Sequence, residues 1–331
     1  MKELVLSNKE MFKRVIGHRD VLNERLEDLL TRAYGEGMSI ISDEEIEELN
    51  EYRQYKCACN LWDELLEFSK NEDLLEKNSL NELERQFHSR FWELYLPKAF
   101  YDFGVKVKRD HRPDPAADFY FDSDGRTIHI EAVADAEPDP KNRVPPVKDG
   151  DLESDLLPPQ TLQRLANSVS GKIEQFQKKR TKGLIGKNDL YVIAVNGYRA
   201  LGDRFCYDHL PPAASLPPPP IVQVLYGIGE PYLSQGKIES SRTNVVKISG
   251  KRDAPSAHFS ESTFRLGAGE EVDIRGIAGV LYSTVNLWSG VPLVNDFMFV
   301  QNPYALDITN LFYFCPKRYV RKDLGSGESH G

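Results

Sequence analysis

The sequence lacks an apolar run of about 18 residues or more, the length that a membrane-spanning helix needs. We therefore expect no membrane partner. The opening stretch, Met-Lys-Glu-Leu-Val-Leu-Ser-Asn-Lys-Glu, has no apolar signal core, which predicts a non-secreted, cytoplasmic protein. Cysteine is scarce: the four cysteines, at 57, 59, 206 and 315, form no disulfide framework and suit reduced thiols. Cys57-Ala-Cys59 has the wrong spacing for a zinc knuckle.

The net charge of −9 argues at first against a nucleic-acid partner. The acids, however, are concentrated in residues 1–80, where 19 acids oppose 11 bases. Residues 81–331 hold 32 acids and 31 bases, so this larger part is nearly neutral and can carry a basic face. The fractions of hydrophobic residues, 40%, and charged residues, 28%, are ordinary for a globular protein.

The spacing of apolar residues divides the chain into a helical N-terminal region, 1–78, an α/β domain, 79–324, and a flexible tail, 325–331. Within the N-terminal region, one helix is expected after the cap-like Ser42-Asp43 and another around 61–68. The acidic faces of this region are either a solvated surface or a site for a protein partner.

The most informative stretch is 115–133, where two short apolar runs flank Asp-Ser-Asp-Gly, a hairpin turn signal. Asp118 opens the first strand, and Glu131 lies inside the second. Because strand side chains alternate between faces, His129, Glu131 and Val133 share one face. A carboxylate in an apolar strand is costly to bury unless it is paired or binds a cation. The stretch is therefore either an exposed hairpin with scattered acids or a divalent-metal site formed by Asp118, Glu131 and the Ala132 carbonyl.

Two helices flank this hairpin. The first, 79–100, begins with a capping-box pattern and carries Glu93 in its most aromatic part. The second, 161–179, has an apolar stripe with polar residues along its flanks, among them Arg164 and Lys172. It ends in the best basic patch of the chain, which includes Lys178, Lys179 and Arg180.

Further strands are expected to begin at 105–107 and to span 190–195, 221–226, 277–282 and 297–300. A long loop, 135–159, separates the hairpin from the second helix, and a proline-rich loop occupies 201–220. Because a helix connects the hairpin to the 190–195 strand, the pattern predicts a mixed sheet with helices on both faces.

The order of helix, strand, hairpin, helix and strand, with acids at 93, 118 and 131, resembles the PD-(D/E)XK nuclease superfamily, the restriction-endonuclease-like fold. The resemblance covers roughly residues 79–200, with Ala117-Asp118 similar to the "PD" element and Glu131-Ala132-Val133 to the "(D/E)XK" element. It implies a catalytic set of Glu93, Asp118, Glu131 and Lys172 with Mg²⁺ or Mn²⁺ as cofactor. It also implies phosphate contacts from the second helix.

One position departs from the family pattern, because Val133 stands where the resemblance implies a lysine. Lys172 is our candidate to replace it, since its long stem can reach the site from the helix edge. It is otherwise a solvated helix lysine. His129 shares the face of Glu131 and is a weaker candidate.

We therefore expect a metal-dependent nuclease that hydrolyses phosphodiester bonds of DNA, with Arg164, Lys178, Lys179 and Arg180 contacting the nucleic acid. One alternative is an inactive nuclease fold that serves as a binding module. The other is an unrelated two-carboxylate hydrolase such as a glycosidase, which the scarcity of tryptophan disfavours. The sequence leaves open a homodimer, as well as the choice between DNA and RNA.

Overall fold

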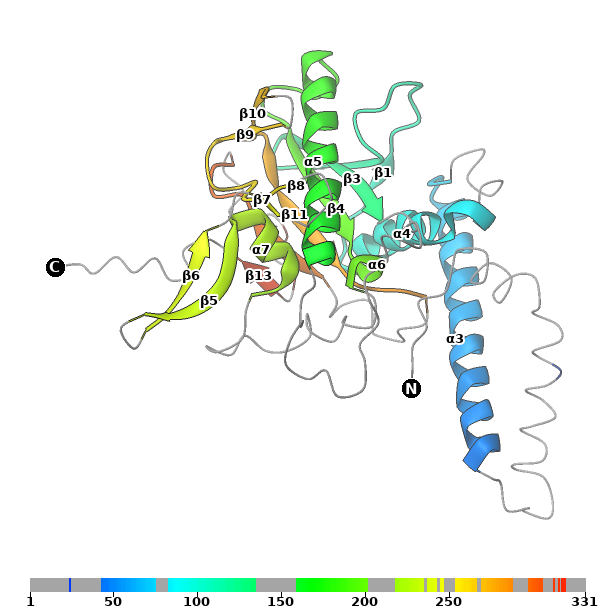
Figure 1. The fold of residues 1–331 in the computed structure, drawn as a ribbon. Coiled ribbons are helices and arrows are strands. Elements are labelled where there is room, and N and C mark those ends of the chain that lie inside the picture. Colours follow the sequence, from blue (N-terminus) through cyan, green and yellow to red (C-terminus); the bar gives the residue numbers. More distant parts are fainter. Residues whose placement is uncertain are drawn as a thin grey trace.

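The computed structural model of the 331-residue chain describes the following residues: 24, 43–75, 83–134, 159–201, 218–234, 237–242, 245–246, 254–266, 269–287, 297–305, 312, 315 and 317–319. Two helices come first, α3 (Asp43–Asn71) and α4 (Leu83–Asp102). The C-terminal half of α3 packs beside α4, where Trp62 stacks on Phe87 with ring centroids 4.9 Å apart. Its N-terminal half extends away from the body of the molecule (Figure 1).

The centre of the fold is a seven-stranded mixed sheet in the order β1-β2-β3-β4-β11-β12-β13. Its strands are β1 (Lys108–Arg109), β2 (Phe119–Ser123), β3 (Arg126–Ala134), β4 (Leu190–Asn196), β11 (Ile277–Ser283), β12 (Met298–Gln301) and β13 (Lys317–Tyr319). The strands β3, β4 and β11 run parallel, and β2 and β12 pair antiparallel to their neighbours β3 and β11. The predicted mixed sheet is therefore present.

A tight hairpin joins β2 to β3. Ser123 pairs with Arg126, so only Asp124 and Gly125 form the turn. Both have positive φ, 50° and 73°, as a two-residue type I′ turn requires. The Asp-Gly pair thus fixes the register that places Asp118 one residue before β2 and Glu131 in the middle of β3.

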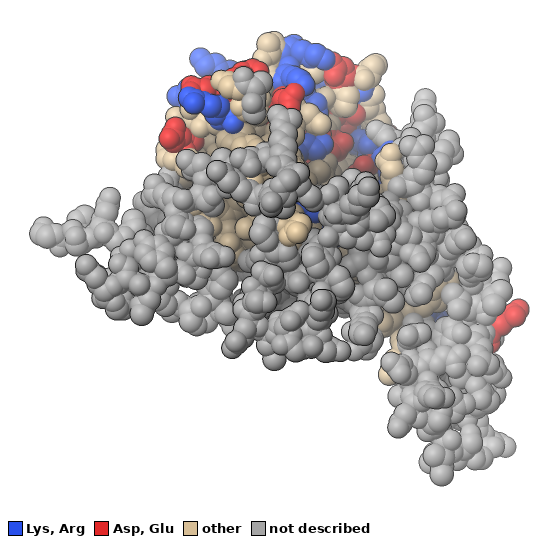
Figure 2. All heavy atoms as spheres, viewed as in Figure 1, with Lys and Arg blue, Asp and Glu red and all other residues tan. Residues whose placement is uncertain are grey.

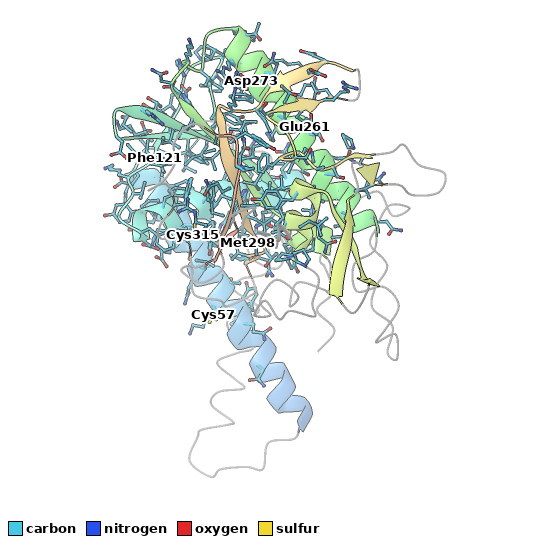
Figure 3. All side chains as sticks on the ribbon, turned by 90° about the vertical axis from the view of Figure 1, so that its left-hand side faces the viewer. Cys57, Phe121, Glu261, Asp273, Met298 and Cys315 are labelled. Atoms are coloured by element: carbon cyan, nitrogen blue, oxygen red, sulfur yellow. The ribbon has the colours of Figure 1, made fainter. Side chains whose placement is uncertain are left out.

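The parallel β3–β4 pair requires a crossover, which the helix α5 (Pro159–Thr181) provides. Each face of the sheet carries its own apolar core. One core joins α3 and α4 to Ile128, Ile130 and Ala132 of β3, and the other joins α5 and α7 (Pro220–Tyr226) to alternate residues of β4, β11 and β12. Phe121 belongs to the first core and Met298 to the second (Figure 3). Glu131 therefore lies on the α5 face.

The remaining described elements surround this sheet. A short helix, α6 (Tyr198–Leu201), follows β4 directly. Three two-stranded sheets are formed by β5 (Ile228–Ser234) with β6 (Lys237–Arg242), β7 (Val245–Val246) with β8 (Ala254–Pro255), and β9 (Thr263–Arg265) with β10 (Glu271–Asp273). The cysteines at 57, 59 and 315 are free thiols.

Three expectations from the sequence are corrected here. Residues 221–226 form α7 and not a strand, because Pro220 starts a helix and Gly227 ends it with φ 64°. Residues 105–107 precede the strand, which begins at Lys108. The helices expected after Asp43 and around 61–68 are one continuous helix, α3.

Several expectations fall on residues that the structure leaves undescribed. They concern the tail 325–331, nearly all of 1–42, the start of the 79–100 helix, and most of the loops 135–159 and 201–220. In the part of the chain that is described, no helix has the length and apolar character needed to cross a membrane.

Candidate active site

The first acid of the site, Asp118, sits where the chain enters β2. The residues before it, Ala116 and Ala117, are fully buried and anchor this entry in the α5-side core. The Asp118 Oδ2 accepts a hydrogen bond of 2.8 Å from the backbone N–H of Ala132. This bond ties the carboxylate to β3 one residue beyond Glu131.

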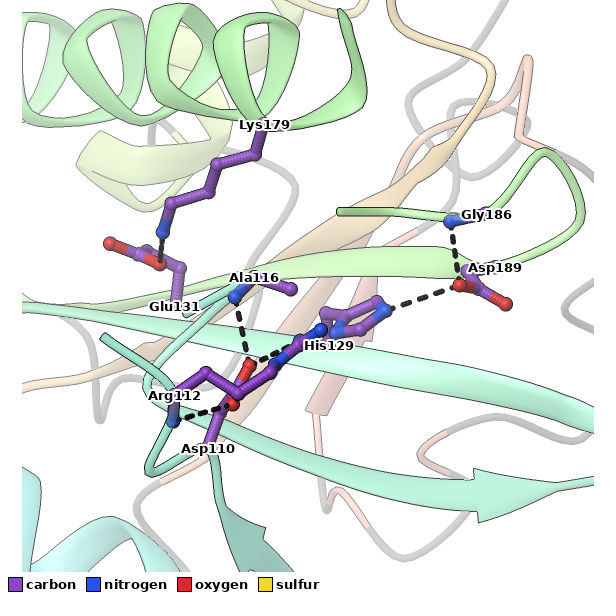
Figure 4. Close-up of polar contacts among 8 residues, drawn as sticks. All are labelled: Asp110, Arg112, Ala116, His129, Glu131, Lys179, Gly186 and Asp189. Atoms are coloured by element: carbon purple, nitrogen blue, oxygen red, sulfur yellow. Dashed lines mark hydrogen bonds and ion pairs between the residues drawn. The ribbon is translucent and has the colours of Figure 1, made fainter. Parts of the chain in front are cut away.

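The second acid, Glu131, is held by two lysines of α5. Lys172 Nζ donates to Oε1 and Lys179 Nζ donates to Oε2, each at 2.8 Å. The Glu131 side chain is 6% exposed, and those of Lys172 and Lys179 are 16% and 18% exposed. The Lys179 side chain reaches from α5 down to the Glu131 carboxylate on the strand below (Figure 4).

The two carboxylates have opposite pKa shifts. Burial, followed by the negative charges of Glu131 and Glu93, raises the pKa of Asp118 to about 7. Burial acts to raise the pKa of Glu131 as well, but the charges and hydrogen bonds of Lys172 and Lys179 outweigh it and lower that pKa. Glu131 is therefore the ionised member of the pair at neutral pH, and Asp118 titrates close to neutrality.

Glu93 approaches the same site from the opposite side of the sheet. It lies on α4, close enough for its charge to raise the pKa of Asp118. Its Oε2 accepts a 2.7 Å hydrogen bond from Arg90 and lies 3.7 Å from Arg109 Nη2. Of the four residues in the implied catalytic set, the structure thus brings Asp118, Glu131 and Lys172 into one site, and Glu93 acts on Asp118 through its charge.

A polar network fixes the loop that leads into Asp118. Asp110 accepts hydrogen bonds from the Arg112 guanidinium on both oxygens and from the backbone N–H of Ala116 (Figure 4). These bonds lower the pKa of Asp110 to about 2, with the Arg112 bond the largest cause. Asp110 therefore stays ionised and holds the turn in place.

The sequence predicted His129 on the same face as Glu131, whereas the contact that the structure gives its ring is with Asp189. Its Nε2 lies 3.3 Å from Asp189 Oδ2, and that same oxygen accepts a hydrogen bond from the Gly186 N–H (Figure 4). Burial lowers the pKa of His129 in spite of the Asp189 contact. His129 therefore joins the β3 face to the loop before β4.

The four basic residues assigned to nucleic acid separate into different environments. Lys178 is exposed and pairs with Glu174 at 2.6 Å, whereas Lys179 turns inward to Glu131. Arg180 lies over the Phe176 ring, 5.5 Å from its centroid. Arg164 Nη1 donates to the Arg199 carbonyl at 3.3 Å. Figure 2 shows basic and acidic side chains interspersed at the upper end of the molecule, where α5 ends.

The donor set suits a hard divalent cation in its chemistry. Carboxylates, a backbone carbonyl and water are the ligands that Mg²⁺ and Mn²⁺ prefer. The N–H and C=O of one strand residue point to the same side, so the Ala132 carbonyl points toward Asp118 as its N–H does. Across the described ranges, no three His, Cys, Asp or Glu side chains are arranged to hold a metal ion by themselves. Asp118 and Glu131 would therefore need the Ala132 carbonyl and water to complete a coordination shell.

Sequence reasoning missed two features of the site. Lys179 was assigned to the outer basic patch, although it follows Lys172 by seven residues and so lies on the same helix flank. Tyr191 on β4 was not singled out. It is fully buried opposite His129 of β3, and burial, followed by the charges of Glu131 and Asp118, raises its pKa well above the usual value.

Comparisons of the chain with protein-family models, with curated proteins and with solved structures gave no match.

Proposed function

We propose that this protein is a metal-dependent nuclease that hydrolyses phosphodiester bonds of DNA, with a restriction-endonuclease-like fold and Mg²⁺ or Mn²⁺ as its cofactor. The observation that carries the proposal is the 2.8 Å contact between Lys172 Nζ and Glu131 Oε1. Lys172 lies on a helix and follows Glu131 by 41 residues, and it supplies the ammonium group that Val133 cannot provide.

The arrangement of elements supports the fold assignment. Helix α4, the hairpin β2–β3, the crossover helix α5 and the parallel strand β4 follow one another in the order that the resemblance implies. The acids lie at matching places: Glu93 on α4, Asp118 at the entrance to β2 and Glu131 inside β3.

Each residue of the site has its own proposed role in the reaction. Asp118, Glu131 and the Ala132 carbonyl would hold the cation, and Glu93 would hold a second ion or an ordered water. When bound, the cation supplies Lewis-acid stabilisation and lowers the pKa of a bound water. Lys172 offers its positive charge to the phosphate oxygens, where negative charge develops. The exposed Lys178 and the neighbouring basic side chains attract the nucleic-acid backbone.

The test is cleavage of supercoiled plasmid, single-stranded DNA and RNA with Mg²⁺ or Mn²⁺. We expect cleavage by the wild-type protein and loss of cleavage in D118N and E131Q. K172M should slow cleavage roughly 10²-fold, the usual effect of removing one positioned charge stabiliser. K106M removes an exposed lysine paired with Glu72, far along the chain from the α5 lysines, and is the matched control.

The binding-module alternative draws on one observation. Both carboxylate oxygens of Glu131 already accept hydrogen bonds from lysines, so the site is charge-compensated without a cation. Wild-type protein that binds DNA with a steep salt dependence but cleaves no substrate would favour this alternative. Cleavage that D118N and E131Q leave unchanged would refute the assigned site.

A further inference from the structure

Two lysines contact one glutamate in the candidate site, and each takes a different oxygen. Lys172 Nζ lies 2.8 Å from Oε1 of Glu131, and Lys179 Nζ lies 2.8 Å from Oε2. All three side chains are largely withdrawn from solvent. Surface ion pairs contribute little to stability, but the coupling within a buried group of three charges is much stronger.

Helix geometry makes this convergence specific. Lys172 and Lys179 are seven residues apart, close to two full turns, so their side chains leave the same flank of α5 about 10.5 Å apart along the axis. Both stems must lean toward the middle to reach one carboxylate. The neighbouring Lys178 is 67% exposed and pairs with Glu174 on the solvent side. The inward position of Lys179 therefore does not follow from the general basicity of the helix end.

The second lysine has a consequence for any cation that enters. Each ammonium group occupies an oxygen lone pair that a metal ion would use, and each adds a positive charge next to the metal position. Repulsion between like charges at such separations amounts to about 1 kcal/mol in water and several times more at lower effective dielectric. Lys172 and Lys179 thus compete with the cation for Glu131.

We propose that Lys179 is a positioning residue which, together with Lys172, forms an ionic clamp on Glu131, and that this clamp lowers the affinity of the site for divalent cations. The inference rests on the metal site of the proposed function. The clamp keeps the buried carboxylate paired in the absence of a cation, and it would give up one oxygen to a bound cation. The ammonium group of Lys179 would then be free to pair with a phosphate oxygen of the substrate.

Isothermal titration of the full-length protein with MnCl₂ tests the clamp without any cleavage assay. In K179M we expect Mn²⁺ to bind roughly tenfold more tightly than in the wild type, because one competing charge is gone. K179R keeps the charge and the reach and should retain an affinity close to wild type. K178M removes a charge one residue away on the solvent side, and it should leave the affinity unchanged.

A melting curve for each variant in EDTA and in Mn²⁺ accompanies the titration. K179M should melt below K178M in EDTA, since Glu131 loses a partner, and Mn²⁺ should raise its melting temperature more than it raises that of the wild type. This second readout also identifies a variant that has failed to fold.

The outcomes separate the clamp from the proposed function. Unchanged Mn²⁺ affinity in folded K179M, with clear binding by the wild type, would overturn the clamp and leave the metal site standing. Weaker binding in K179M would also overturn it, because Lys179 would then assist the cation. Binding that appears only in K179M would support the clamp in its strongest form. If neither protein binds Mn²⁺, both the clamp and the metal site are refuted.

Discussion

Acid should destabilise this protein through a histidine that has no part in the proposed chemistry. His88 on α4 is fully buried, and its Nε2 lies 3.1 Å from Asn196 Oδ1 at the end of β4. Burial is the largest cause that lowers its pKa, the positive charge of Arg199 is the next, and the pKa falls from 6.5 to about 3. Folded His88 therefore stays neutral at a pH where the unfolded chain binds a proton.

The sign and size of the effect follow from proton linkage. Between pH 6.5 and about 3 the unfolded state binds more protons at this position than the folded state, so stability falls as the pH falls. At pH 5 the unfolded histidine lies 1.5 pH units below its pKa of 6.5. At about 1.4 kcal/mol per unit, His88 alone should lower the free energy of unfolding by about 2 kcal/mol relative to neutral pH.

Urea unfolding of wild-type protein and H88Q at pH 7.5, 6, 5 and 4.5 measures the contribution of His88 to the free energy of unfolding. Glutamine can still donate to Asn196, and it does not titrate. Other groups contribute equally to both proteins, so the stability difference between them isolates His88. We expect H88Q to have the lower free energy of unfolding at pH 7.5. Between pH 7.5 and pH 5 the free energy of unfolding of H88Q should rise by about 2 kcal/mol relative to that of the wild type. Parallel pH profiles for the two proteins would refute the assignment of a neutral, buried His88.

Two further predictions concern the site and the sheet. Because folding raises the pKa of Asp118 from 3.8 to about 7, its contribution to stability is fully present only below pH 3.8 and is lost as the pH rises from there to about 7. D118N should therefore melt higher than wild type at pH 8, and this advantage should be clearly smaller at pH 5; an equal difference at both values would contradict it. A Cβ at Gly279 would lie 2.4 Å from the Val300 carbonyl oxygen, so G279A should cost about 1–3 kcal/mol in chemical unfolding. G171A is the matched control, since a Cβ at helical Gly171 meets nothing within 4 Å, and it should stabilise the protein by about 0.5–1 kcal/mol; similar effects for both substitutions would refute this packing.

The parts of the fold that local signals encode could be predicted from the sequence. Asp124-Gly125 defines the hairpin because few residues accept positive φ at both turn positions, and strand alternation then places Glu131 and Val133 on one face. The crossover helix follows from the apolar stripe of 161–179. Residues 221–226 were mistaken for a strand because a short apolar run fits a strand and a buried helix equally well.

The site itself could be predicted only in part. The residue types and spacings indicated Asp118, Glu131 and Lys172, but the direction of a lysine at a helix edge depends on what faces it. Lys178 and Lys179 are adjacent and chemically identical, and one meets Glu174 in solvent while the other meets Glu131 under the helix. The packing of α5 over β3 decides which of the two lysines belongs to the site. This packing joins Lys179 to Glu131, which are 48 positions apart in the sequence.

The central claim is that Asp118 and Glu131 form a metal-dependent site for phosphodiester hydrolysis. Its most direct test is the rate at which wild-type protein nicks supercoiled plasmid as Mg²⁺ or Mn²⁺ is added back after EDTA treatment, measured beside E131Q. Cleavage by the wild type that appears with the cation, and its absence in folded E131Q, is the result that the account predicts. Cleavage at equal rates in the two proteins, or none in the wild type at any cation concentration, would contradict it.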